Sequence, residues 1–245
     1  MYPIESDPIG PPSFRIDFQL DTMQRYLAHL GAGMLQERGS VEERLRAIAA
    51  TLSGDELAIF GGFYSAEVSE FEHDFPRLLY SGFLVSCYSF VELSLLRVCE
   101  EYRLRLKVSA LDRDNPDKGI FRARHFLKLA GSCELPNDLW QELTFINSIR
   151  NTISHEWGAI PTFFAPEESE EGNLTPIQDS DGLTYFIQIE PNLLKYLQRH
   201  RLLTFQPPTF LVSPTFEFCQ HFIDLSWTLF HYIYDSLEKT HRRRP

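Results

Sequence analysis

The chain has 245 residues, of which 43% are hydrophobic and 13% aromatic, so it can bury a substantial core and is not expected to be disordered as a whole. A formal net charge of -11 argues against a non-specific grip on nucleic acid, because such binding depends on many Lys and Arg contacts to phosphates. Residues 97–128 hold nine Lys or Arg against five Asp or Glu, so any RNA contact would be local. The four cysteines show no CxxC pair, which predicts reduced core residues and no zinc site.

Residues 1–13 contain four prolines and no basic segment followed by an apolar one. They predict an extended arm, not a signal peptide, and the protein is expected to be cytoplasmic. Residues 14–75 are predicted to form N-terminal helices that pack on a bundle. The periodicity places these helices at 17–36, 41–52 and 55–72, with Ser40 as an N-cap and a break or kink at Phe75-Pro76.

Residues 76–160 are predicted to form the bundle core, beginning with a long helix over 77–107. Between Leu78 and Leu96 the only charged residue is Glu92, which raises the question of a membrane span. Several serines interrupt this stretch and no basic flank sets an orientation, so a buried central helix is the better interpretation. Glu92 would then lie among apolar neighbours and not in open water.

A helix over 118–129 is followed by one over 135–157, whose apolar positions form a stripe about 80° wide that includes Ile153, Trp157 and Arg150. A buried guanidinium keeps its proton and needs anionic partners or a polar cleft. His155 lies about 140° around an ideal helix from Arg150. For the two to share a site, either the helix distorts near Gly158 or a second copy of the chain packs alongside.

An acidic insertion is predicted over 161–190, with a short strand at 183–189. Residues 191–245 are predicted to form a C-terminal segment with an aromatic-rich helix over 214–239 and a basic tail. The expected fold class is therefore all-α: a helical bundle with a small insertion that contains a short strand or hairpin.

The Arg150-Asn151-x-x-x-His155 pattern, on a helix that follows a long apolar helix, resembles the signature of the HEPN superfamily (higher eukaryotes and prokaryotes nucleotide-binding domains). The resemblance covers roughly residues 77–158. It implies an all-helical bundle that dimerises to form a composite cleft. It also implies a metal-independent endoribonuclease of the toxin or anti-phage defence type, with RNA as substrate, no cofactor and a possible antitoxin or inhibitor protein as partner.

The resemblance also suggests roles for four residues. His155 would act as general base or acid, because imidazole exchanges protons near neutral pH. Arg150 would hold the phosphate and stabilise charge developing on it. Asn151 would orient the phosphate or the histidine, and Glu92 would orient Arg150 or His155. The products would carry 2′,3′-cyclic phosphate and 5′-hydroxyl ends.

A second interpretation belongs to another class of function. The same bundle could be a non-catalytic module that binds a nucleotide, RNA or a protein. Arg150 would then bind an anion or bridge helices, and a Glu92–Arg150 ion pair would be structural. The acidic charge favours this alternative, and the complete Arg-Asn-x-x-x-His pattern favours the enzyme.

Overall fold

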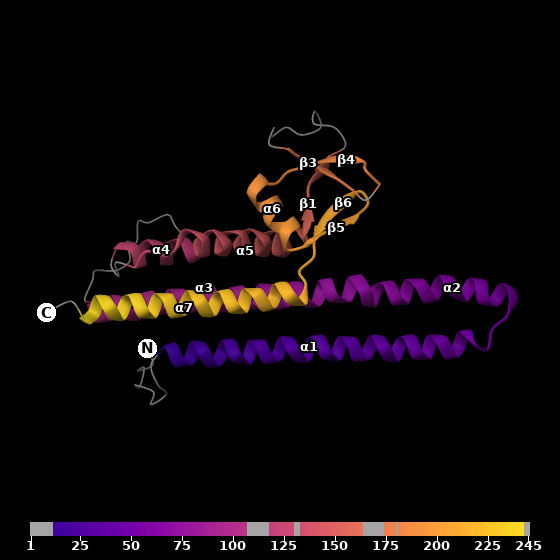
Figure 1. Cartoon of the computed structure of the whole chain (residues 1–245), viewed down its shortest axis with the longest axis horizontal. Coiled ribbons are helices and arrows are strands. Elements are labelled where there is room, and N and C mark those ends of the chain that lie inside the picture. The colour runs from indigo at the N-terminus through magenta and orange to yellow at the C-terminus, as the bar shows by residue number, and fades with distance from the viewer. Residues whose placement is uncertain (1–11, 107–117, 130–132, 164–173, 180, 243–245) are drawn as a thin grey trace. The chain divides into compact units, whose positions relative to one another are not determined.

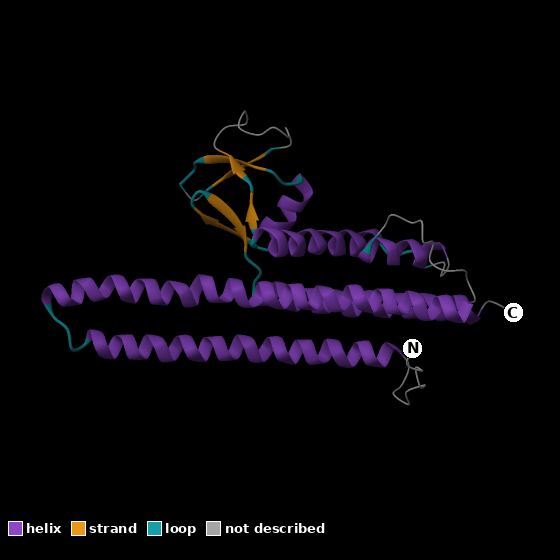
Figure 2. Ribbon diagram, turned by 180° about the vertical axis from the view of Figure 1, so that it is seen from behind, coloured by secondary structure: helices purple, strands orange, loops and turns teal. Residues whose placement is uncertain are grey.

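The computed structural model describes residues 12–106, 118–129, 133–163, 174–179 and 181–242, and it is mainly α-helical, as predicted, with short antiparallel strands (Figures 1 and 2). Residues 1–11 of the predicted arm, residues 164–173 and 180 of the acidic insertion, and residues 243–245 lie outside the described residues. The helical elements are α1 (Pro12–Ala49), α2 (Gly54–Ser69), the π-helix η1 (Glu70–Asp74), α3 (Phe75–Leu106), α4 (Gly119–Leu129), α5 (Asn137–Glu156), α6 (Pro191–Arg199) and α7 (Phe216–Arg242).

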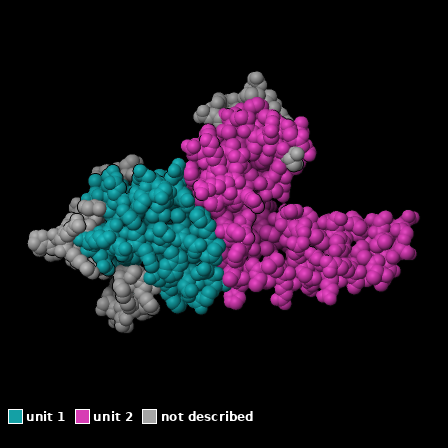
Figure 3. All heavy atoms as spheres, in the orientation of Figure 1, with its two compact units in different colours: residues 1–25, 86–144, 220–245 teal, residues 26–85, 145–219 magenta. Residues whose placement is uncertain are grey.

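The chain divides into two compact units, each built from separated stretches of sequence (Figure 3). Unit 1 comprises Met1–Arg25, Ser86–Thr144 and Gln220–Pro245. Unit 2 comprises Tyr26–Val85 and Phe145–Cys219. The boundaries fall within α1, α3, α5 and α7.

Unit 1 has a core of large side chains from α3, α4 and α7. The rings of Tyr88 and Phe222 stack with centroids 6.3 Å apart, and both side chains are completely buried. Burial raises the pKa of the Cys87 and Cys99 thiols to about 12, so both are held as neutral thiols. All four cysteines are free and buried, which confirms their prediction as reduced core residues.

In the N-terminal region, α1 is one continuous helix, so the predicted break near Ser40 is wrong. Interior Gly39 costs the helix about 1 kcal/mol relative to alanine, which is too little to end it. Arg38 donates to the Glu42 carboxylate one turn later at 2.8 Å, and Val41 and Leu45 are buried on the same stretch. Ser40 is therefore a helix-interior residue.

The predicted break at Phe75-Pro76 is a change of helix type. The chain passes from α2 through the π-helix η1 into α3, and the extra residue per turn lets Pro76 follow without ending the helix. Within unit 2, α2 runs antiparallel to the distal part of α1 (Figure 1). The Arg44–Glu67 ion pair joins α1 to α2, and the Arg38–Glu72 ion pair joins α1 to η1. Despite its apolar sequence, α2 has no buried residue.

Among the described residues, one helical run, Gly54–Leu104, is long and apolar enough to cross a membrane by length and composition alone. Half of its most apolar window is buried inside the structure. The core helix of a soluble protein meets the same criterion, so this is weak support for a membrane span.

Six short strands in unit 2 form two antiparallel sheets, ordered β1-β6-β5 and β2-β4-β3. Their bounds are β1 (Ala159–Ile160), β2 (Thr162–Phe163), β3 (Thr175–Gln178), β4 (Thr184–Ile187), β5 (Leu203–Gln206) and β6 (Thr209–Val212). The predicted strand at 183–189 is confirmed by β4, but the other strands and α6 were not predicted. β1 and β2 have only two residues each, which is too short for an alternating pattern to show.

Candidate functional site

The apolar stripe of α5 is real, but its composition differs from the prediction. Its buried members are Leu139, Trp140, Leu143, Ile146 and Ile149, whereas Ile153 is half-buried and Trp157 is 83% exposed. Trp157 leaves the stripe because it adopts a left-handed conformation with φ of 55° just after the helix ends at Glu156. Arg150 lies within the stripe by helical position and is half-buried, as the sequence indicated.

Asn151 holds the guanidinium of its neighbour. The Nη1 group of Arg150 donates a hydrogen bond to Oδ1 of Asn151 at 2.7 Å. Both side chains are half-buried, and this contact fixes the direction of the planar Arg fork. The direct contact of Asn151 is therefore with the arginine, whereas the resemblance suggested the phosphate or the histidine.

His155 lies in the last turn of α5 and is exposed. The helix keeps its α-helical form through Glu156, so any distortion comes after the histidine. The prediction that the helix bends near Gly158 to bring Arg150 and His155 together is wrong. In one chain the two residues remain about 140° apart around α5. The alternative, a site shared with a second copy, stays a prediction.

Gly158 ends the helix and passes the chain directly into β1. Its φ is 83°, its N–H donates to the Thr152 carbonyl at 3.1 Å, and its own carbonyl accepts from Val212 N–H at 2.7 Å. A Cβ at this position would lie 2.9 Å from the Val212 carbonyl oxygen. Only glycine fits without displacing backbone, so the end of the motif helix is fixed against β6.

A pocket of about 390 Å³ in unit 2 runs along the last two turns of α5 and reaches β1 and α6. Ile149, Thr152 and Glu156 contribute from α5, and Glu190 and Leu193 contribute from the start of α6. The two carboxylates would repel a phosphate at short range. This pocket is therefore poorly suited to an RNA backbone, although it adjoins the motif.

Glu92 lies in unit 1, half-buried on α3, and it faces the start of α4. Its carboxylate occupies the space beside Gly119, where an added Cβ would lie 2.1 Å from Oε1. A carboxylate at a helix N-terminus is stabilised by the unpaired N–H groups and the helix dipole. This position gives Glu92 a structural function in unit 1, and its catalytic role stays a prediction.

Two basic residues of the segment 97–128, Arg103 and Arg124, have local partners. Arg103 makes two hydrogen bonds to the Glu100 carboxylate, at 2.6 and 2.7 Å. The guanidinium of Arg124 lies 4.4 Å from the centre of the Trp140 ring. These contacts use part of the basic charge that the sequence offered for a local RNA contact.

Comparison of the chain with protein-family models, with curated proteins and with solved structures finds no match. Among the described residues, no group of three or more His, Cys, Asp or Glu side chains is placed to hold a metal ion.

Proposed function

We propose that this protein is a metal-independent endoribonuclease in which Arg150 and His155 are catalytic. The observation that carries the proposal is the Arg150–Asn151 hydrogen bond of 2.7 Å, one turn before an exposed histidine. A fixed guanidinium fork is suited to bidentate contact with a phosphate, and an exposed imidazole is accessible to a ribose hydroxyl. Metal-free RNA cleavage requires both functions, a cation that binds the phosphate and a group that exchanges protons with the ribose.

In the proposed reaction the ribose 2′-oxygen attacks its neighbouring phosphorus and loses its proton to the imidazole of His155. The bond from phosphorus to the 5′-oxygen breaks, and that oxygen takes up a proton from water or from the imidazolium of His155. The products are a 2′,3′-cyclic phosphate and a 5′-hydroxyl. The Arg150 guanidinium contacts the phosphate oxygens and stabilises the added negative charge of the transition state.

A second chain would bring the two catalytic groups together. Arg150 and His155 start about 140° apart around α5, which supports a site shared between two copies. We therefore propose a homodimer in which Arg150 of one copy faces His155 of the other. A ribonuclease of this kind would act as a toxin or an anti-phage defence effector in the cytoplasm. Such an enzyme needs restraint, for which an antitoxin or inhibitor protein is the expected partner.

The alternative is a non-catalytic scaffold that binds RNA, a nucleotide or a protein. Glu156 and Glu190 in the pocket beside the motif favour it, as does the position of Glu92 at the start of α4. In this alternative the Arg150–Asn151 contact only anchors the end of α5.

The test is cleavage of total RNA and transfer RNA in excess EDTA, with the product ends mapped. His155→Ala and Arg150→Ala should each lower the cleavage rate roughly a hundredfold or more. The matched controls are His29→Ala and Arg25→Ala, exposed residues of α1, which should cleave like the wild type. No cleavage by a folded wild type, or equal loss in the controls, would favour the scaffold.

Mixing the two inactive variants tests the shared site. A heterodimer of Arg150→Ala and His155→Ala chains contains one composite site with both residues intact and one with neither. Activity restored on mixing would support the composite cleft. Its absence, with exchange of subunits demonstrated, would contradict it.

A further inference from the structure

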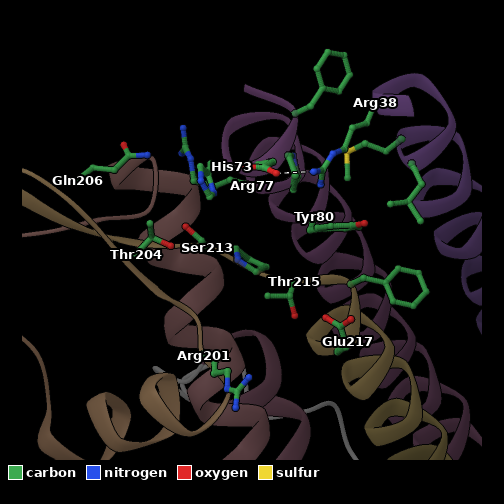
Figure 4. Close-up of a pocket in the computed structure, with 17 residues that line it drawn as sticks. Arg38, His73, Arg77, Tyr80, Arg201, Thr204, Gln206, Ser213, Thr215 and Glu217 are labelled. Carbon is green, nitrogen blue, oxygen red and sulfur yellow. Dashed lines mark hydrogen bonds and ion pairs between the residues drawn. The ribbon is translucent and has the colours of Figure 1, made fainter. Parts of the chain in front are cut away.

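A second pocket, of about 350 Å³, lies within unit 2, far along the sequence from the Arg150 motif. Its lining comes from the middle of α1, from η1 and the start of α3, from β5 and Arg201 just before it, and from the chain between β6 and the first turn of α7. In Figure 4, Arg38 and Arg77 approach from the helices, and Thr204, Gln206 and Ser213 lie on the strand side. The volume is within the range of small-molecule sites.

Two residues that line this pocket each have a buried polar atom with no hydrogen-bond partner among the described residues. These atoms are Nε of Arg77 and the hydroxyl oxygen of Ser213. A buried N–H that belongs to a permanent cation is costly when nothing accepts from it. Both atoms can donate a hydrogen bond, so the missing component is an acceptor, and beside a guanidinium the preferred acceptor is an anion.

The backbone around the pocket points to the same chemistry. The π-helix η1 supplies Phe71, Glu72 and His73 to the lining, and π-helical turns are rare and occur often at functional sites. The first turn of α7 adds the positive end of a helix dipole, with Thr215 capping it by accepting from Phe218 N–H at 3.2 Å.

The three arginines of the pocket are not equivalent. Arg38 is held by ion pairs to Glu42 and Glu72, so its charge is largely compensated. Arg201 lies apart from Arg38 and Arg77, at the other end of the pocket (Figure 4). Arg77 is therefore the group best placed to take an anion. The exposed carboxylate of Glu217, also in the lining, opposes an anion there.

We propose that this pocket binds the phosphate group of a small phosphorylated molecule, with Arg77 as its principal contact. Ser213 donates a further hydrogen bond to the same phosphate. The aromatic rings of Phe71 and Phe216, both in the lining, offer apolar surface to the remainder of the ligand. The site is independent of the proposed ribonuclease chemistry, because it shares no residue with the Arg150 motif.

The experiment is titration calorimetry of the full chain with inorganic phosphate and, separately, with AMP. Arg77→Met keeps the aliphatic stem and removes the charge, and should weaken binding of both probes roughly tenfold or more. Arg44→Met is the matched control, because Arg44 is an arginine of α1 in the same unit but is not in the pocket lining, and this variant should bind like the wild type. Tighter binding of AMP than of phosphate identifies a phosphate ester as ligand, and equal binding identifies free phosphate.

The Glu217→Gln variant distinguishes a loss of the binding contact from a loss of the fold. Removing this carboxylate should tighten binding of both probes roughly two- to fivefold, a gain that an unfolded variant cannot show. The proposal is overturned if neither probe binds saturably at millimolar concentration. It is also overturned if folded Arg77→Met binds like the wild type, or if Glu217→Gln leaves the affinities of both probes unchanged.

Discussion

The core of unit 1 and helix α2 of unit 2 contain similar apolar residues in very different surroundings. Phe222 is completely buried in unit 1, whereas Phe63 on α2 is 68% exposed and Ile59 is 67% exposed. Apolar composition alone therefore does not determine which side chains are buried in this chain. A side chain is buried where several helices meet, whereas α2 lies beside α1 and none of its side chains is buried.

The largest expected effect is the difference in the free energy of unfolding between alanine variants of Phe222 and Phe63. Phe222→Ala should lower the free energy of unfolding by about 3–5 kcal/mol, because it leaves a cavity in a closed core. Phe63→Ala, the matched change on α2, should alter it by no more than about 0.5 kcal/mol. Urea denaturation of both variants measures the pair. Equal losses would mean that the exposed face of α2 is covered in solution.

Alanine substitutions at two glycines should change stability by smaller amounts, and in opposite directions. Gly119 has a φ of 56° and faces Glu92, so Gly119→Ala should destabilise unit 1 by about 1–3 kcal/mol. Gly62 lies inside α2 with nothing within 4 Å of an added Cβ, so Gly62→Ala should stabilise the protein by about 0.5–1 kcal/mol. Thermal denaturation checks both signs, and destabilisation by Gly62→Ala would contradict the open surroundings of α2.

The smallest expected change in stability comes from the ion pair between α1 and α2. Arg44 and Glu67 pair at 2.9 Å, but both side chains are substantially exposed. Arg44→Ala should therefore cost no more than about 1 kcal/mol, and less in high salt. Urea denaturation at two salt concentrations measures it. A larger, salt-independent loss would show that the hairpin depends on this pair more than its exposure indicates.

The sequence was most informative where long periodic helices bury one face. The 118–129 helix matches α4, and the helix predicted at 135–157 matches α5 to within two residues. It was least informative where a local signal was overridden. Gly39-Ser40 and Phe75-Pro76 both indicated interruptions, yet neighbouring ion pairs and a π-helical turn carry the helix through each.

The two candidate sites differ in what the sequence could show. Arg150, Asn151 and His155 lie within one short motif, so they could be found without coordinates. Arg77 and Ser213 are 136 positions apart in the sequence and line the same pocket only because of the fold. No sequence motif links them. The partnerless atoms that single them out depend on burial, which no spacing rule supplies.

The interleaved division of the chain has a consequence for biosynthesis. Unit 1 draws on the beginning, the middle and the end of the sequence, so α3 and α4 leave the ribosome well before most of α7 exists. The apolar faces of α3 and α4 stay uncovered until Phe222 and Phe230 have been synthesised. During that interval the nascent chain exposes hydrophobic surface that is prone to aggregation, which is the surface that chaperones bind.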